Sequence, residues 1–264
     1  MPTTWQAFQD RKYARGKKSD ALENHRKPRR LDYFQPEAIL FVHSRSIFEI
    51  MADYKKPDSW ALKARKEGYP ARSVYKLQEM DEKFGLLKPM RPGAQFRVLD
   101  LGAAPGSWSL YVLRKMARLP GARALLVAAD LCPLSRQFDA GLFDGESFRF
   151  AHGDITDAAV RETILSQGPY NLIVSDAAPA TTGNRFVDTC RSQELTLEVV
   201  SYAEAALADG GNLVAKVFQG GDTSDLLKRL RALFKTAKSY KPQACRSDSF
   251  ETYYCALQRV RAAT

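Results

Sequence analysis

Hydrophobic and polar positions divide the chain into two parts, with the change near residue 60. From Trp60 onward hydrophobic residues recur at helical spacing, and in the segment 71–84 Val74, Leu77 and Met80 fall on one face. Charged residues occupy another face, as expected of an amphipathic helix packed against a core. The pattern therefore predicts a helix over 71–84.

The first fifty residues show little periodicity. They are dense in Lys and Arg and contain one short apolar island, at 38–42. A segment of this composition buries too little apolar surface to fold alone. We therefore expect residues 1–50 to form a basic, irregular N-terminal extension and residues 51–264 to form the folded domain. The stretch from Met51 also resembles the start of a protein, so in the alternative reading translation begins there.

After residue 93 short apolar runs alternate with helical patterns, an order typical of α/β folds. The expected strands cover 98–101, 123–130, 148–154, 170–176 and 212–218, with two closing strands near 236–241 and 252–259. The expected helices cover 107–116, about 188–208 with a stop at Gly210–Gly211, and 222–234. This order predicts a mostly parallel, doubly wound sheet with an antiparallel closing strand. His152 is expected to be a packed core histidine.

The composition indicates a cytoplasmic globular protein. Hydrophobic residues make up 45% of the 264 residues, ample for a core. No apolar run approaches the roughly 20 residues of a membrane helix, and the N-terminus has no apolar signal region. The four cysteines form no Cys-x-x-Cys pair and the three histidines are scattered. We therefore expect reduced thiols, no metal site and no membrane partner.

A glycine-rich turn follows directly on an apolar run in the segment 98–108, VLDLGAAPGSW. A strand, a glycine turn and a helix in this order commonly bind nucleotides. The turn lacks the Gly-x-Gly-x-x-Gly pattern of dinucleotide sites and the Gly-x-x-x-x-Gly-Lys-Ser/Thr pattern of triphosphate sites. The sequence therefore argues against both of those ligand classes.

Carboxylates stand at the ends of three expected strands, at Asp100, Asp130 and Asp154. The carboxyl ends of parallel strands meet at the edge where ligands bind. An acid after the second strand can hold a ribose diol, and one after the third can accept from an adenine amino group. With Trp108, whose ring can face a sulfonium, they favour a cationic nucleoside such as S-adenosylmethionine. The alternative is a merely tight turn whose acids cap strands.

Five segments together carry a resemblance to one family. They are DLGAAPGSWS in the turn, SVYKL with Lys76, SDAAPATTG with Asp176, AKVFQGG with Lys216 and SFETYY with Glu251. In this order they resemble the FtsJ-like RNA 2′-O-ribose methyltransferases, and most of all the bacterial members that methylate large-subunit ribosomal RNA. The resemblance covers residues 72–257.

The resemblance implies a Rossmann-like methyltransferase fold with S-adenosylmethionine as cofactor. It implies a catalytic set at Lys76, Asp176, Lys216 and Glu251, and cofactor contacts at Gly106, Trp108, Asp130, Asp154 and Asp176. Two departures stand out. Ser107 replaces the family's usual second glycine, which is expected to narrow the cofactor turn slightly. The stretch 133–148 is longer than the usual link, which weakens the assignment of Asp154 relative to Asp130.

The chemistry of these residues is consistent with that role. A ribose 2′-hydroxyl must lose its proton as it attacks, and a neutral lysine amine is a stronger base than histidine. Lys216 is the candidate base, and its place in the apolar run LVAKVF requires a carboxylate partner, which Asp176 or Glu251 can supply. Lys76 can supply a neighbouring cation or orient the target ribose or phosphate. No metal is needed, because a neutral thioether leaves; a purely structural ion-pair network is the alternative.

A net charge of +10 favours a polyanionic partner, although many basic proteins bind no nucleic acid. The candidate RNA contacts are Lys63, Arg65, Lys66 and Arg72, because this cluster leads into Lys76. Further basic candidates are Arg185, Lys235, Lys238 and Lys241, and Tyr69 and Tyr75 can stack on bases.

The predicted function is S-adenosylmethionine-dependent 2′-O-methylation of structured RNA, and the resemblance favours a uridine of 23S ribosomal RNA in the large subunit. One alternative is a transfer RNA anticodon-loop ribose. The other is a non-catalytic, RNA-binding ribosome-assembly factor, which would be free to lose members of the catalytic set. A monomer is favoured.

Overall fold

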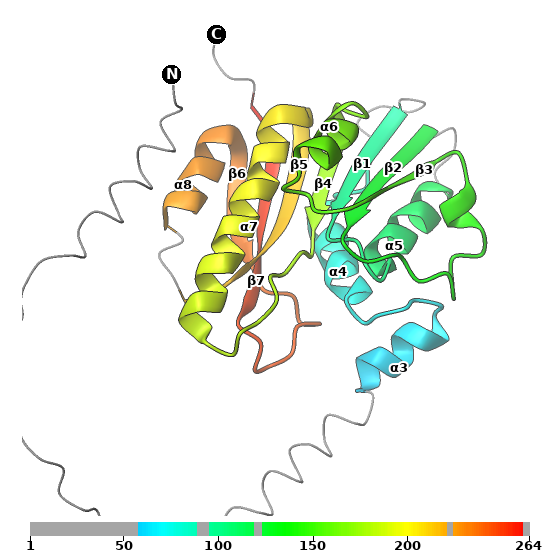
Figure 1. The fold of residues 1–264 in the computed structure, drawn as a ribbon, viewed down its shortest axis with the longest axis horizontal. Coiled ribbons are helices and arrows are strands. Elements are labelled where there is room, and N and C mark those ends of the chain that lie inside the picture. Colours follow the sequence, from blue (N-terminus) through cyan, green and yellow to red (C-terminus); the bar gives the residue numbers. More distant parts are fainter. Residues whose placement is uncertain (1–57, 89–94, 119–122, 221–223, 261–264) are drawn as a thin grey trace, which may run out of the picture. The chain divides into compact units, whose positions relative to one another are not determined.

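The structure, a computed structural model, describes residues 58–88, 95–118, 123–220 and 224–260 (Figure 1). The N-terminal segment 1–50 and the alternative start at Met51 lie outside the described residues.

A seven-stranded sheet forms the centre of the domain, in the order β3-β2-β1-β4-β5-β7-β6. The strands are β1 (Gln95–Leu101), β2 (Arg123–Asp130), β3 (Phe148–His152), β4 (Tyr170–Ser175), β5 (Leu207–Phe218), β6 (Phe234–Tyr240) and β7 (Glu251–Arg259). Strands β1 to β5 pair in parallel, and β7 pairs antiparallel with both β5 and β6. This arrangement confirms the predicted mostly parallel, doubly wound sheet with an antiparallel closing strand.

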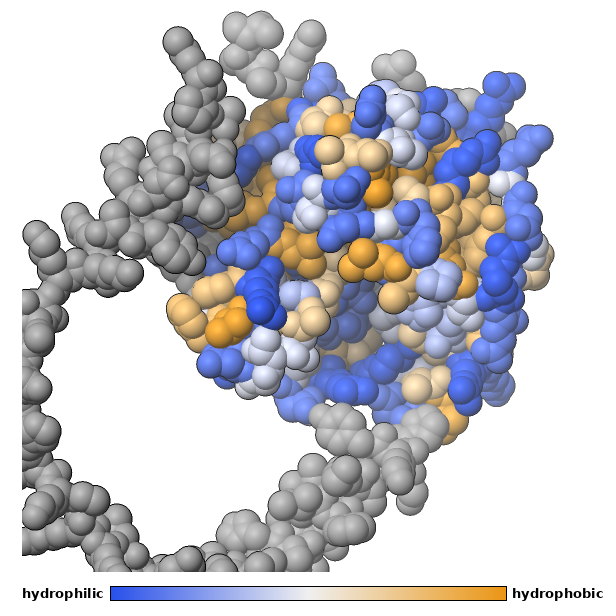
Figure 2. All heavy atoms as spheres, viewed as in Figure 1, coloured by the Kyte–Doolittle hydropathy of each residue, from blue (hydrophilic) through white to orange (hydrophobic). Residues whose placement is uncertain are grey.

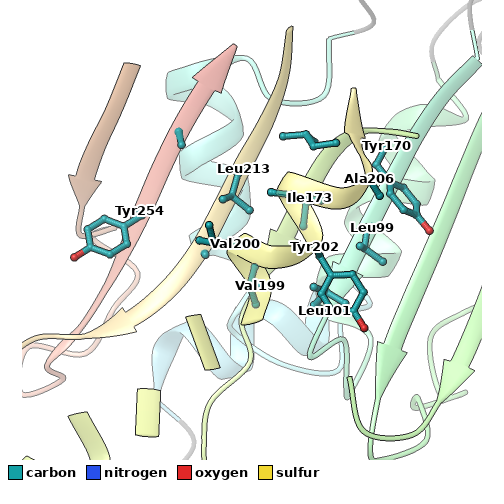
Figure 3. Close-up of a cluster of buried hydrophobic side chains, with 14 of the residues drawn as sticks. Leu99, Leu101, Tyr170, Ile173, Val199, Val200, Tyr202, Ala206, Leu213 and Tyr254 are labelled. Atoms are coloured by element: carbon teal, nitrogen blue, oxygen red, sulfur yellow. The ribbon is translucent and has the colours of Figure 1, made fainter. Parts of the chain in front are cut away.

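Helices cover both faces of this sheet. The helices are α3 (Ser59–Lys66), α4 (Val74–Phe84), α5 (Ser107–Met116), α6 (Ala158–Leu165), α7 (Arg185–Ala206) and α8 (Ser224–Leu233), with a short 3₁₀ turn at Leu142–Asp144. Successive strand residues face opposite layers, so β1 directs Leu99 and Leu101 to one core and Val98 to the other. Figure 3 shows the first core, in which Val200 and Tyr202 of α7 pack over the strands.

The structure differs from the sequence expectation where α7 meets β5. Helix α7 ends at Ala206, and the Gly210–Gly211 pair lies inside β5 instead of ending the helix. The pairing with β4 shifts register between Leu207 and Asn212, which leaves room for a bulge. Gly210 has a φ of +75°, and a Cβ on Gly211 would lie 2.8 Å from the carbonyl oxygen of Ala208. The two glycines therefore allow the backbone conformation and close contacts that the bulge requires.

Two further differences concern β3 and the segment after it. Helix α6 was not expected, although Asp157 marks its start by accepting hydrogen bonds from the amides of Ala159 and Val160. The expectation of a core histidine was wrong. His152 is exposed, with its Nε2 2.9 Å from the carbonyl oxygen of Leu131. β3 is an edge strand, so His152 pairs with Asp130 of β2 on one side and has no neighbouring strand on the other.

Candidate active site

The carboxyl ends of β1 to β4 border a cavity of about 710 Å³. Its lining comes from Gly102 and Ala104 after β1, residues 130–132 after β2, residues 153–156 after β3, residues 176–180 after β4, and Arg191, Glu194, Leu195 and Glu198 of α7. Strands β1 and β4 are neighbours in the sheet, so the cavity opens where the strand order reverses, the usual ligand site of such folds. Three predicted cofactor contacts, Asp130, Asp154 and Asp176, line this cavity.

The glycine turn after β1 brings the backbone close to the segment after β4. Gly102 has a φ of +76°, and a Cβ there would lie 2.5 Å from the Cα of Ala177. The amides of Gly102 and Ala103 both donate to the carbonyl oxygen of Ala129, at 2.9 and 3.1 Å. Only glycine fits this approach, so the first glycine of the motif is required by packing against Ala177.

Asp130 is held by main-chain donors on either side of its carboxylate. Its Oδ2 accepts from the amide of Ala104 at 2.9 Å, and its Oδ1 accepts from the amide of Cys132 at 2.8 Å. Each oxygen has a second lone pair, so the carboxylate keeps acceptor capacity for a ligand. Asp130 therefore presents a pre-oriented acceptor at the end of β2.

Asp154 lies at the cavity edge after β3. Its Oδ1 accepts from both the amide and the hydroxyl of Thr156, each at 2.8 Å. These hydrogen bonds outweigh partial burial and hold the pKa of Asp154 below its ordinary value. The carboxylate is therefore ionised, and the long stretch 133–148 does not remove it from the cavity.

Gly106 and Trp108 do not line the cavity. Gly106, with a φ of +106°, is the residue before α5, and the Trp108 indole is buried with its Nε1 donating to the carbonyl oxygen of Ser73 at 2.8 Å. Ser107 also turns away, since its hydroxyl accepts from the Ala71 amide at 2.8 Å. Contrary to the expectation, the Ser107 side chain therefore does not narrow the turn. The Gly106 amide donates to the carbonyl oxygen of Ala103 at 2.7 Å, so only the amides of the first turn of α5 lack intrahelical partners, as at any helix start.

The four predicted catalytic residues meet as two ion pairs at this same edge. Lys216 of β5 places its Nζ 3.0 Å from Asp176 Oδ1 and 2.5 Å from the Asp176 carbonyl oxygen. Lys76 of α4 places its Nζ 2.6 Å from Glu251 Oε1 at the start of β7. All four side chains are largely buried, with at most 18% of any of them exposed.

Tyr253, which sequence reasoning missed, links the two pairs. Its hydroxyl donates to Asp176 Oδ1 at 2.6 Å, and its ring centroid lies 5.8 Å from the Nζ of Lys76. Its ring also packs 6.0 Å from that of Trp108. The available signal was its spacing, because residues two apart on a strand share a face and Tyr253 is two after Glu251.

The charge states of Lys76 and Asp176 result from two opposing effects on their pKa values, burial and the charges of their partners. For Lys76, burial lowers the pKa, but the carboxylates of Asp176 and Glu251 raise it above its ordinary value. For Asp176, burial raises the pKa, but Lys216, Lys76 and the Tyr253 hydroxyl hold it below its ordinary value. Lys76 therefore stays cationic and Asp176 anionic at neutral pH.

Asp100 is fully buried near the end of β1, two residues before Gly102 of the cavity lining. Its Oδ2 accepts from the Ser109 hydroxyl at 2.7 Å, and its Oδ1 has no hydrogen-bond partner among the described residues. Burial, assisted by the charges of Asp176 and Asp130, raises the pKa of Asp100 to about 7. The group is thus part neutral and part ionised at physiological pH.

The predicted RNA contacts separate into two kinds. Lys63, Arg65 and Lys66 are exposed on α3, with the Lys63 ammonium 4.6 Å from the Tyr75 ring centroid. Arg72 instead bonds to Asp58 and, at 2.6 Å, to the carbonyl oxygen of Ala244, with 17% of its side chain exposed. Arg72 therefore ties α4 to the loop before β7.

The described residues place limits on other chemistry. Among them no cluster of His, Cys, Asp and Glu is suited to hold a metal ion. Over the same part of the chain, none of the helices combines the length and apolar character of a membrane span.

Comparison with known proteins agrees with this geometry. The chain is 48% identical to a protein of Treponema denticola and 42% identical to one of Oleidesulfovibrio alaskensis, each named Ribosomal RNA large subunit methyltransferase E. Both alignments cover 77% of this chain, with 96% and 92% of the respective relatives. A solved structure from Plasmodium falciparum, assigned as a ribosomal RNA methyltransferase, matches with a TM-score of 0.59 and 25% identity, over 73% of this chain and 99% of that one. The sequence profile described as FtsJ-like methyltransferase matches residues 69–259. The chain belongs to the FtsJ-like methyltransferase family.

Proposed function

We propose that this protein transfers a methyl group from S-adenosylmethionine to a ribose 2′-hydroxyl of large-subunit ribosomal RNA, at a uridine of 23S RNA. The protein acts in the cytoplasm as a monomer. The observation that supports this proposal most strongly is the pair of buried ion pairs, Lys216–Asp176 and Lys76–Glu251, set against the ligand cavity.

The cavity fits a nucleoside of this kind. Its volume of about 710 Å³ falls within the range of roughly 300–1,000 Å³ that small-molecule sites occupy. Asp130 would accept from the ribose diol of the cofactor and Asp154 from the adenine amino group. The methionine end of the cofactor would extend beyond the cavity toward the first turn of α5, whose backbone N–H groups suit its carboxylate. S-adenosylmethionine supplies an electrophilic methyl group on a sulfonium when bound.

Lys216 is the proposed base. In its neutral form the amine accepts the proton of the 2′-hydroxyl as that oxygen attacks. The ammonium that results donates to the carboxylate and the carbonyl oxygen of Asp176, which are already 3.0 and 2.5 Å away. These preplaced acceptors favour the transfer without reorganisation.

Lys76, Glu251 and Asp176 position the reacting groups. Lys76 stays cationic, so it orients the target ribose or its phosphate and does not act as a base. Glu251 holds Lys76 at 2.6 Å, and Tyr253 fixes the Asp176 carboxylate. Positioning of this kind can supply about 7–11 kcal/mol of the rate enhancement.

The test is transfer of labelled methyl from S-adenosylmethionine, offered in parallel to undermodified large ribosomal subunits, deproteinised ribosomal RNA and transfer RNA. We expect label on one ribose of the large-subunit RNA. Label on transfer RNA alone would preserve the mechanism and overturn the substrate. Bound cofactor with no label on any RNA would favour the assembly-factor alternative.

A further inference from the structure

Directly beside the catalytic set, two aromatic rings meet where β5 ends and β7 begins. Phe218 is the last residue of β5 and pairs in register with Glu251, while Phe250 immediately precedes Glu251. The ring centroids of Phe218 and Phe250 lie 4.6 Å apart at 61°. The amide of Gln219 donates to the Phe250 carbonyl oxygen at 2.7 Å, which joins the two segments.

An arginine covers one of these rings. Arg185, the first residue of α7, places its guanidinium carbon 5.3 Å from the centroid of the Phe250 ring. A Cβ on Gly220 would lie 3.7 Å from the Nε of Arg185, so the arginine is close to that glycine as well as to the ring. Arg185 is nevertheless exposed and Phe250 only half-buried, whereas Phe218 beneath is 8% exposed.

The surface around Arg185 is also apolar. Phe186, the next residue of α7, is 73% exposed. Figure 2 shows hydrophobic surface at this N-terminal end of α7, next to hydrophilic surface. Unpaired bases stack on exposed aromatic rings, and they also stack on the plane of an Arg guanidinium.

The position of this surface decides which base it meets. The 2′-hydroxyl must reach Lys216, and Phe218 projects from the same face of β5 two residues further on. Phe250 and Glu251 are adjacent, about 3.8 Å apart at their Cα atoms. The platform therefore lies at the same end of β5 and β7 as Lys216 and Glu251, while the cofactor cavity lies at the ends of β1 to β4.

We propose that Phe250 and Arg185 form a stacking platform for the base of the target nucleotide. The inference rests on the proposed function, and it adds a recognition site for an unpaired base. Stacking is tolerant of base identity, so the platform selects a splayed, single-stranded nucleotide over a helical one.

The test is a double-mutant cycle between protein and RNA, read as the equilibrium affinity for a fragment of the methylated region without methyl donor. Phe250→Leu keeps an apolar side chain against Phe218 and removes the ring. We expect it to weaken binding of intact RNA about tenfold, within the range measured for base stacking. Removing the target base from the RNA should weaken wild-type binding by a similar factor. The two losses should not add: Phe250→Leu and wild type should bind the abasic RNA equally.

Matched variants separate stacking from charge and folding. Phe250→Trp should restore or exceed wild-type affinity. Arg185→Lys keeps the charge but loses the plane, and it should weaken binding several-fold, whereas Arg231→Lys on the exposed face of α8 should not. Additive losses, or coupling to a neighbouring nucleotide in place of the target, would overturn the platform. If wild type methylates the intact RNA, such a result leaves the proposed function standing; if wild type methylates no RNA, it is the proposed function that fails.

Discussion

At the scale of single residues, two buried carboxyl groups at neighbouring strand ends have opposite environments. Asp176 has Lys216 and Lys76 beside it, which hold its pKa low. Asp100 is fully buried, and this burial together with the charges of Asp176 and Asp130 raises its pKa to about 7. Environments that push pKa values apart often mark functional sites. The pair also sets opposite pH dependences of stability.

The first prediction concerns the role of Lys216. Lys216→Arg keeps a cation beside Asp176, but a guanidinium stays protonated and cannot accept the hydroxyl proton. We expect methyl transfer to fall about 10²–10⁴-fold, with the affinity for S-adenosylmethionine and the melting temperature near those of wild type. Single-turnover methylation and calorimetric titration measure these quantities. Wild-type turnover in this variant would exclude Lys216 as the base, and Lys235→Arg on β6 is the control.

The second prediction concerns Asp100 and pH. Its folded pKa is raised above the ordinary value of 3.8, so between about pH 4 and pH 7 the unfolded chain releases a proton that the folded protein keeps. Stability from this group therefore falls as pH rises, by about 1.4 kcal/mol per pH unit. Asp176, with a lowered pKa, behaves oppositely and loses its contribution only below about pH 4.

Asp100→Asn removes this ionisation while retaining an acceptor for Ser109. We expect the variant to gain stability relative to wild type between pH 5 and pH 7, as followed by urea unfolding at several pH values. A constant difference in unfolding free energy across that range would contradict the raised pKa of Asp100.

At the scale of elements, the site is assembled from segment ends. Lys76 lies in the first turn of α4, Asp176 follows β4, Lys216 lies near the end of β5 and Glu251 begins β7. The glycine turn between β1 and α5 fixes the opposite wall, because Gly102 touches Ala177 directly after Asp176. A change in this turn is therefore expected to affect both the cavity and the proposed catalytic residue Asp176.

The third prediction compares two glycines with similar backbone angles. Gly102 and Gly141 have φ of +76° and +79°, but a Cβ at Gly141 meets nothing within 4 Å. Gly141→Ala should cost only the left-handed strain, about 1–2 kcal/mol of unfolding free energy. Gly102→Ala should cost more and also weaken binding of S-adenosylmethionine, because Ala177 must move. Denaturant unfolding and calorimetric titration test both, and equal effects would show that the contact with Ala177 is unimportant.

At the scale of the whole molecule, some basic residues are exposed to a partner while others are bonded within the protein. Arg65 and Lys66 are exposed on α3, while Arg72 is committed to contacts with Asp58 and Ala244. The net charge of +10 predicts RNA affinity that falls with salt. Only exposed cations near the site should set the slope of that dependence.

The fourth prediction concerns that slope. Arg65→Ala should reduce the slope of log affinity against log salt by about 0.7–0.9. Arg118→Ala, which removes another exposed arginine, after α5, should leave the slope unchanged. Filter-binding titrations at several salt concentrations provide the measurement. Equal slopes for both variants would place the RNA elsewhere on the surface.

Periodicity and motif order accounted for much of this molecule. The strand over 123–130 and the helix over 107–116 have the predicted bounds, because buried elements carry unbroken apolar patterns. The strand ends and motifs also named Asp130, Asp154 and Asp176 of the cavity lining, but not Glu194 and Glu198 of α7. The end of α7 was misplaced, because a Gly-Gly pair has the same local signature at a helix end and at a bulge.

By itself, the sequence determined the fold class, the ligand edge of the sheet and the residue types of the site, since these depend on local pattern. The tertiary structure alone decided the partners: Lys76 with Glu251 and Lys216 with Asp176, although either carboxylate was available to Lys216. It also buried the Trp108 indole against Ser73 and committed Arg72 to Ala244. The physical reason is that charges and hydrogen bonds over long sequence separations depend on which strands are neighbours, and the order β4-β5-β7 exists only in the folded sheet.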